Sequence, residues 1–313
     1  MKETKNVRRQ KWGRSSKQVF SMAMLGAVFL AIFSYLPMFG VVLAFKDGDN
    51  KLNMMDAIFR SDWVGLKNFK DFFTDSQFMP VLVNTLGYNL LSLVISFPIT
   101  IIFALLLNEI KNNKLKRGIE FFVHLPYFIS MVVFVGIIHS MLDVRTGVLN
   151  DLLMSLGMIS SPINFKGDPA YSWGLMIISN LVKGVGWGTI IYLAAIAGTD
   201  ESLYEAAELD GANRLQRAVH ITLPAISNLI ILNLILSISG ILNNGAADML
   251  LWQTQSNLAK TEVIDTFVMK NGISNMLYSY TSAVGLFKSV LSFILIFLSN
   301  KLSRKITGEG VIY

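Results

Sequence analysis

The distribution of charged side chains is the feature that most constrains how this chain can fold. Six long segments are almost free of charge, and their residue ranges are 18–45, 76–108, 121–142, 169–199, 218–247 and 271–300. A bilayer core about 30 Å thick is crossed by roughly 20 apolar residues in a helix, and every segment reaches that length. Because the backbone inside lipid must satisfy its own hydrogen bonds, such segments form helices. The sequence therefore predicts an all-α membrane protein with six transmembrane helices.

Composition excludes several other classes of protein. Charged residues make up only 15% of the chain, compared with about 25% in a typical soluble protein. The high apolar content argues against a disordered chain. Because the chain has no Cys, it cannot be a disulfide-stabilised domain, a thiolate zinc module or an enzyme with a cysteine nucleophile. The long continuous apolar segments also differ from the short alternating strands of a membrane β-barrel.

Lys and Arg are distributed unevenly between the connections that join the six segments. Sixteen lie on the side that holds both termini, and nine lie in the longer loops of the other side. The positive-inside rule makes the first side cytoplasmic. We therefore expect a basic cytoplasmic N-terminus at 1–17, a transmembrane domain at 18–300 and a cytoplasmic tail at 301–313. A nucleic-acid-binding arm or a signal peptide is an alternative interpretation of 1–17, but the apolar run that follows is too long for a signal and lacks a cleavage site.

The connection between the fourth and fifth segments, residues 199–224, has the most specific pattern. Asp200 can cap a helix whose first turns are acidic, and Gly211 permits a left-handed C-cap. Pro224 lies where the next membrane helix begins, a position that tolerates proline. The pattern predicts two short helices joined by a turn, with a small apolar face suited to a groove on another protein. An ordinary amphipathic connector on the membrane surface is the alternative.

Within this connection, Glu205-Ala206-Ala207, Gly211 and Ile221-x-Leu223-Pro224 follow a fixed spacing. The spacing is EAA, three residues, G, nine residues, I-x-L-P, and it resembles the EAA loop of binding-protein-dependent ABC importer permeases. This resemblance covers residues 70–300 and implies a type I importer transmembrane domain. In that family the loop forms coupling helices that seat in a cleft of the ATPase subunit. The residues that the resemblance assigns to ATPase coupling are Tyr204, Glu205, Ala206, Ala207, Asp210, Gly211, Leu223 and Pro224.

Two further segments, 35–46 and 262–289, resemble the LplB-type sugar permeases, which serve oligosaccharide or polysaccharide uptake. The implied partners are a second, non-identical permease, an ATP-binding cassette ATPase dimer, an extracytoplasmic sugar-binding protein and the lipid of a bacterial cytoplasmic membrane. No nucleic acid is expected. The chain lacks the phosphate-binding sequence G-x-x-x-x-G-K-[ST], so we expect ATP and Mg on the partner ATPase. The chain itself is therefore expected to need no cofactor and to be no enzyme.

Polar and aromatic residues inside the predicted spans are candidates for the substrate path. Sugars are bound through hydrogen bonds and aromatic faces, and a charge inside the bilayer is costly unless it snorkels or faces a cavity. The candidates are Tyr88, Asn89, Asn180, Lys183, Trp187, Asn243, Asn244 and Lys288. Helix packing or structural pairing is the alternative for each. The sequence Gly184-Val185-Gly186-Trp187-Gly188 is expected to give close helix packing and local flexibility.

Two other classes of protein remain open at this stage. A secondary transporter needs an internal inverted repeat and ionisable residues that bind the coupling ions. A membrane-embedded enzyme needs a cluster of His, Asp or Glu inside the membrane. His124, His139 and His220 lie on different segments and lack metal-ligand spacing. We therefore expect no catalytic site and no metal site.

Overall fold

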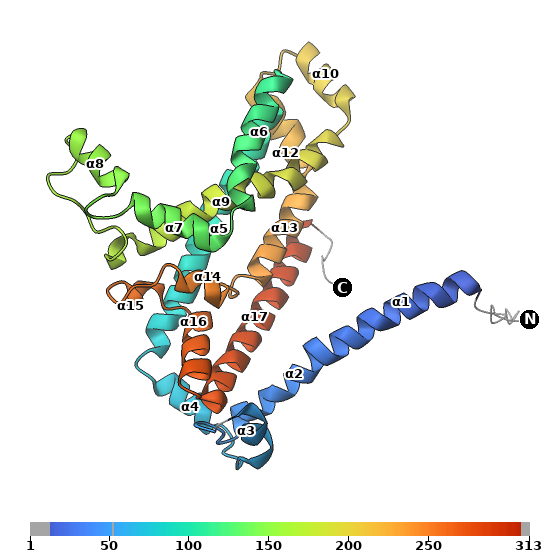
Figure 1. Ribbon diagram of the computed structural model, residues 1–313. Coiled ribbons are helices and arrows are strands. Elements are labelled where there is room, and N and C mark those ends of the chain that lie inside the picture. The colour runs from blue at the N-terminus through green and yellow to red at the C-terminus, as the bar shows by residue number, and fades with distance from the viewer. Residues whose placement is uncertain (1–12, 52, 308–313) are drawn as a thin grey trace, which may run out of the picture.

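The computed structural model describes residues 13–51 and 53–307, and they fold almost entirely into helices (Figure 1). The α-helices of the first half are α1 (Arg14–Leu30), α2 (Leu36–Met38), α3 (Met54–Arg60), α4 (Lys67–Thr74), α5 (Phe78–Asn108), α6 (Asn113–Phe128), α7 (Met131–Met141) and α8 (Val148–Ser155). Those of the second half are α9 (Pro169–Ala197), α10 (Glu201–Leu209), α11 (Arg214–Arg217), α12 (Leu223–Ala225), α13 (Ser227–Ser239), α14 (Ala246–Leu250), α15 (Leu258–Thr261), α16 (Ile264–Met269) and α17 (Tyr278–Thr307).

Short helices of other types join these elements. Three are π-helices, η1 (Ala31–Tyr35), η3 (Ala218–Thr222) and η4 (Lys270–Ser274), and η2 (Phe39–Phe45) is a 3-10 helix. Among the described residues, extended segments pair at a single bridge between Lys46 and Trp63. The described part of the chain therefore confirms the all-α prediction.

Four helical segments of the described chain are long and apolar enough to cross a membrane. They are Arg14–Phe45, Phe78–Asn108, Pro169–Ala197 and Tyr278–Lys301. Two further segments meet the same criterion only as bent pairs: α6 with α7, bent by 102°, and residues 214–225 with α13, bent by 66°. Every charge-poor segment of the sequence coincides with one of these. The structure thus has four candidate spans, or six when each bent pair counts as one.

Capping side chains determine where several helices begin. They accept hydrogen bonds from the backbone N–H groups of the first turn, which have no partners within the helix. The Asn112 side chain accepts hydrogen bonds from two N–H groups at the start of α6. The Ser130 hydroxyl accepts one such bond, from the Val133 N–H at the start of α7, directly after the bend. Asp168 caps α9, which begins with Pro169. Local sequence therefore determines where these helices begin, including the restart in the middle of the first bent pair.

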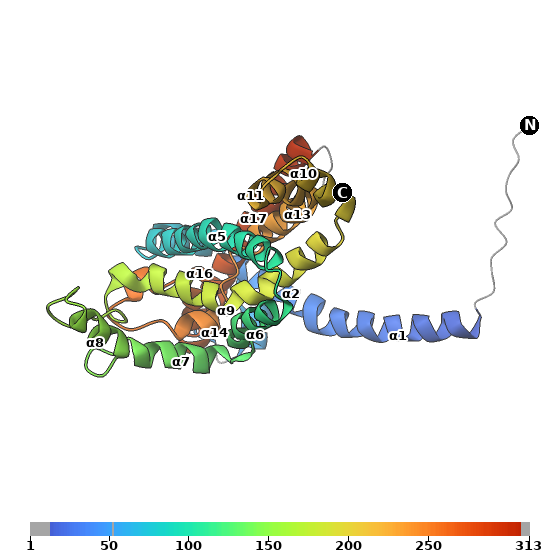
Figure 2. The ribbon, with the colours of Figure 1, turned by 90° about the horizontal axis from the view of Figure 1, so that it is seen from above.

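The first helix extends away from the rest of the molecule (Figures 1 and 2). Every residue from 13 to 39 is exposed, although most of this segment is apolar. In water such a surface would be unfavourable, but lipid tails are as apolar as the side chains. Residues 1–12 lie outside the described part of the chain, so the predicted basic terminus 1–17 is described only from Gly13. At the other end, α17 continues to Thr307 and so enters the predicted tail 301–313.

The centre of the molecule is the contact between α5 and α9. On one side of it, Tyr88, Val135 and Met176 pack with Trp252 in a buried apolar cluster. A second cluster lies nearer to α10 and joins Ile101 of α5 with residues of α9 and with the connection between α12 and α13. The two long helices are therefore fixed to each other along much of their length.

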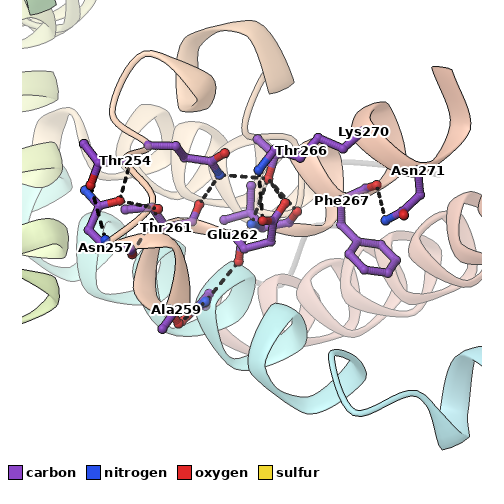
Figure 3. Close-up of polar contacts among 12 residues, drawn as sticks. Thr254, Asn257, Ala259, Thr261, Glu262, Thr266, Phe267, Lys270 and Asn271 are labelled. Carbon is purple, nitrogen blue, oxygen red and sulfur yellow. Dashed lines mark hydrogen bonds and ion pairs between the residues drawn. The ribbon is translucent and has the colours of Figure 1, made fainter. Parts of the chain in front are cut away.

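Residues 246–277 form a compact folded segment that the sequence analysis did not predict. It contains α14, α15, α16 and η4, and its polar side chains bond to one another and to the backbone (Figure 3). Asn257 donates to the carbonyl of Trp252, and the Thr266 hydroxyl donates to Glu262 at 3.1 Å. Asn84 of α5 donates to the carbonyls of Ala259 and Glu262, each at 3.0 Å. These bonds attach the segment to α5.

The glycine-rich part of α9 packs against two neighbouring helices, as the sequence predicts. A Cβ atom on Gly186 would lie 2.5 Å from the carbonyl oxygen of Val123 in α6, and one on Gly188 would lie 2.9 Å from Thr100 of α5. Gly184 has no such neighbour within 4 Å. Close approach therefore explains two of the three glycines.

Gly186→Ala is therefore expected to destabilise the protein by about 1–3 kcal/mol, because the added methyl group forces α6 and α9 apart. Gly184→Ala is the matched control and is expected to be neutral or slightly stabilising, since alanine favours helix over glycine. Thermal unfolding of the purified protein in detergent measures both. Equal stability of the two variants would show that α6 and α9 are not in close contact.

Candidate functional site

The connection between α9 and α13 folds as two short helical arms with a tight turn between them. Asp200 caps α10 by accepting a hydrogen bond from the Ser202 N–H at 3.0 Å, and this bond holds the pKa of the Asp200 carboxyl below its ordinary value. At the other end Gly211 has a φ of 79°, a conformation that glycine adopts without strain. The N–H groups of Gly211 and Ala212 bond back to Glu208 and Ala207, which is a Schellman motif. Both predicted caps are confirmed.

The second arm begins with a capping box and is bonded to the first arm. Asn213 and Gln216 exchange side-chain and backbone hydrogen bonds at the start of α11. The hydroxyls of Tyr204 and Thr222 lie 2.9 Å apart, and Arg217 bonds Glu208 at 3.0 Å. The loop is therefore a defined structure and not a flexible connector.

The outer surface of this loop is open. Leu209 is 90% exposed, and a hollow of about 320 Å³ lies between the two arms. Its lining residues are Ala207, Asp210, Gly211, Ala212, Gln216, Arg217, His220 and Ile221. Of the other predicted coupling residues, Glu205, Ala206 and Pro224 are exposed, whereas Tyr204 and Leu223 are partly buried. An exposed leucine beside a hollow is a surface that a partner protein can cover.

The loop is joined firmly to the membrane helices. Ile226 is buried against Ile101 of α5 and against Tyr192 and Ile196 of α9, and Leu223 packs on the same cluster. Because close-packed side chains leave little room for independent displacement, the end of the loop, α5, α9 and α13 form one packed unit.

A groove of about 550 Å³ lies between α5, α9 and α13, beyond this cluster. The lining residues are Asn89, Ser92, Leu93, Ser96, Phe97, Thr100, Trp187, Gly188, Ile191, Tyr192, Asn233, Ser237, Gly240 and Ile241. None of these described residues carries a charge. Hydroxyl and amide groups beside an indole ring suit a ligand rich in hydroxyl groups.

Two of the eight substrate-path candidates, Asn89 and Trp187, line this groove. The site analysis of the sequence omitted Ser92, Ser96 and Thr100, which follow Asn89 at helical spacing on one face of α5. That periodicity is the signal that could have identified them. Serine and threonine are common in ordinary membrane helices, where their hydroxyls bond to the backbone, so the signal alone is weak.

The other candidates lie outside the groove lining. Tyr88 is 3% exposed and accepts a hydrogen bond from Asn180 at 2.7 Å, so this pair links α5 to α9 inside the apolar cluster. Asn243 lines a different cavity. Asn244 bonds Asn89, and Lys288 forms an ion pair with Asp265 of α16.

Lys183 lies at the bend between α6 and α7. Its ammonium group donates hydrogen bonds to the carbonyls of Pro126, Tyr127 and Ile129, and it lies 5.4 Å from the centre of the Phe134 ring. The carbonyls at the end of a helix have no partners within that helix, and a cation beside them also suits the helix dipole. Lys183 therefore stabilises the end of α6 where the bent pair breaks.

Comparison with known proteins identifies the family of the chain. Residues 96–308 match the model of the binding-protein-dependent transport system inner membrane component. The chain belongs to this family. It is a transporter permease subunit of the bacterial inner membrane, and it has the type I ABC permease fold.

Two relatives and one solved structure illustrate this membership. The permease is 41% identical to Protein LplB of Bacillus subtilis (strain 168), over 97% of this chain and 92% of that protein. It is 38% identical to the polygalacturonan/rhamnogalacturonan transport system permease protein YteP of the same organism, over 94% and 90%. It also superposes with a TM-score of 0.85 and 30% identity on a chain of a bacterial alginate ABC transporter in complex with an alginate pentasaccharide-bound periplasmic protein, covering 95% of this permease and 98% of that chain.

Lys183→Met is expected to lower the stability of the permease by about 2 kcal/mol or more, because charge-assisted bonds to three carbonyls are lost together. Lys114→Met is the control, since Lys114 is exposed near the start of α6, the helix whose last carbonyls accept hydrogen bonds from Lys183 of α9. The melting temperature of the permease in detergent and its transport activity per folded molecule are both measured. Unchanged stability with lost uptake would instead place Lys183 in the substrate path.

Proposed function

We propose that this permease subunit forms half of the translocation path of an ATP-driven importer for oligosaccharides or polysaccharide fragments. The carrying observation is that an exposed coupling loop is packed directly onto the helices that line an uncharged polar groove. Hydrogen-bonding groups beside the exposed indole of Trp187 fit a carbohydrate. The names of the relatives support the same substrate class, because they include a permease for polygalacturonan and rhamnogalacturonan and an importer of alginate.

The proposed topology has six spans, with each bent pair counted as one. The basic segment 1–17, the loop 199–224 and the tail 301–313 lie in the cytoplasm, and the transmembrane domain is 18–300. The excess of Lys and Arg on that side supports this orientation. The exposed apolar surface of the first span, Arg14–Phe45, then faces membrane lipid and the second permease.

ATP and Mg are bound by a partner ATPase dimer, because the chain lacks a phosphate-binding loop sequence. The permease itself then needs no cofactor and performs no catalysis. A second, non-identical permease completes the other wall of the groove, which is open along one side. An extracytoplasmic sugar-binding protein delivers the substrate, as in the alginate transporter crystallised with its periplasmic protein.

The proposed mechanism follows from the rigid attachment of the loop. Closure of the ATPase dimer on ATP moves the coupling loop, and Leu223 and Ile226 transmit that movement to α5 and α9. The groove then changes from facing the cytoplasm to facing the binding protein, so ATP shifts the population between two arrangements of the same helices.

Ala207→Trp is the variant that tests this function. The indole fills the hollow between the two arms and is expected to reduce ATP-dependent sugar uptake by about tenfold or more, which corresponds to roughly 1.4 kcal/mol of lost coupling. Membrane insertion should be unchanged. Uptake of radiolabelled oligosaccharide and ATPase stimulation by the binding protein are measured in vesicles.

Ala23→Trp is the control, because it makes the same substitution at an exposed position of α1, far from the loop in sequence. It is expected to leave ATPase stimulation intact. Normal coupled uptake by the Ala207→Trp protein would overturn the assignment of the loop.

A further inference from the structure

A small cavity lies where the folded segment 246–277 packs against α7 and α9. The lining residues are His139, Lys166, Ser172, Leu175, Met176, Trp252, Asn257 and Thr261. The centre of a water-sized sphere can occupy about 10 Å³ there, which is space for one water molecule. Most of the lining side chains carry polar atoms, so the cavity differs from the dry voids of an apolar core.

Trp252 brings a buried hydrogen-bond donor to this cavity. The residue is 4% exposed, and its indole belongs to the apolar cluster that includes Tyr88, Val135 and Met176. Within the described chain no atom accepts a hydrogen bond from its Nε1 nitrogen. The indole nitrogen can only donate. A buried donor without an acceptor is costly, and folded proteins nearly always supply one.

Two polar neighbours in the cavity wall cannot accept this bond. The Asn257 side-chain oxygen already accepts from the Thr254 N–H and from the Thr261 hydroxyl, at 2.8 and 3.0 Å. The amide nitrogen of Asn257 donates to the carbonyls of Lys166 and Trp252, each at 2.9 Å. The ammonium group of Lys166 is a donor only. Asn257 is therefore saturated, and Lys166 is the wrong kind of group.

Two other lining residues can bond to a water molecule. Ser172 is 4% exposed, and the bond from its hydroxyl to the carbonyl of Asp168 is long, at 3.5 Å. The His139 ring lies perpendicular to the Trp252 indole, with ring centres 5.4 Å apart. A hydroxyl oxygen and a neutral imidazole nitrogen both accept hydrogen bonds. One water can therefore accept from the indole and donate to these groups, which gives it the two to four partners that buried waters have.

We propose that one buried water molecule is bound in this cavity and accepts the hydrogen bond of the Trp252 indole. It joins the folded segment 246–277 to α7 through His139 and to α9 through Ser172. A chloride ion is the alternative occupant, because Lys166 is basic and none of the described lining residues is acidic. The small volume and the exposure of Lys166 to solvent favour the neutral water over the larger anion.

Isosteric replacement of the indole tests this site in the full-length permease. The amino acid 3-benzothienylalanine, inserted in place of Trp252 by stop-codon suppression, keeps the shape of tryptophan and replaces its N–H with sulfur. The melting temperature in detergent is expected to fall by about 2–4 °C, because a net hydrogen bond is lost. An unchanged or higher melting temperature would overturn the proposal, since removal of a donor without a partner relieves a cost.

Two other tryptophans provide matched controls for the same replacement. The Trp173 indole donates to the carbonyl of Lys260 at 2.7 Å, so its replacement is expected to lower the melting temperature by a similar amount. Trp63 is 68% exposed, so its replacement is expected to have no effect. A fall at Trp63 equal to that at Trp252 would overturn the proposal, because the analogue itself would then be destabilising.

Exchange of chloride for gluconate in the buffer distinguishes the two occupants. With a bound water, the difference in melting temperature between the unaltered protein and the Trp252-substituted protein is expected to be the same in both buffers. Loss of that difference in gluconate would overturn the water and identify a halide site.

Cryo-electron microscopy of the permease in its native complex, at a resolution that shows ordered waters, locates the occupant directly. One density peak is expected in the cavity within hydrogen-bond distance of Trp252 Nε1. A cavity without density, or an indole that donates to a protein carbonyl instead, would overturn the proposal.

Discussion

A helix that breaks inside a membrane must find partners for the backbone groups that it frees, and most of this structure follows from how that requirement is met. Lys183 donates to three carbonyls where α6 ends, and Asp265 accepts the N–H of Asn244 beyond the end of α13. Without these charged groups, the free backbone groups would face hydrocarbon and the breaks would be unfavourable. Lys183 therefore supports one break directly, and Lys288 supports the other through its ion pair with Asp265.

The breaks in turn allow a groove to exist between helices that are otherwise closely packed. Gly186 and Gly188 bring α9 against α6 and α5, while the departure of the chain from α13 at Gly240 leaves space beside α5. The coupling loop is packed onto the same helices through Ile226. The same helices therefore line the groove and hold the loop, so the loop and the groove belong to one packed unit.

The sequence predicted the helical class, the apolar segments and the loop 199–224, because each has a local signal. The caps at Asp200 and Gly211 depend only on nearby residues, and the structure confirms them. The bends and the folded segment 246–277 could not be predicted in this way. They depend on pairs such as Asn84 with Glu262 and Lys288 with Asp265, which are distant in sequence. Charge-free windows reveal that a segment can cross lipid, but they carry no information about where its helix breaks.

Affinity purification of the tagged full-length permease from its native membranes, followed by mass spectrometry, tests the central claim most directly. The account predicts that a P-loop ATPase and a second, non-identical permease copurify with the unaltered chain. It further predicts that Ala207→Trp loses the ATPase and retains the second permease, because only the coupling loop is altered. Recovery of the folded permease without an ATPase, or equal recovery of the ATPase with the variant, would contradict the account.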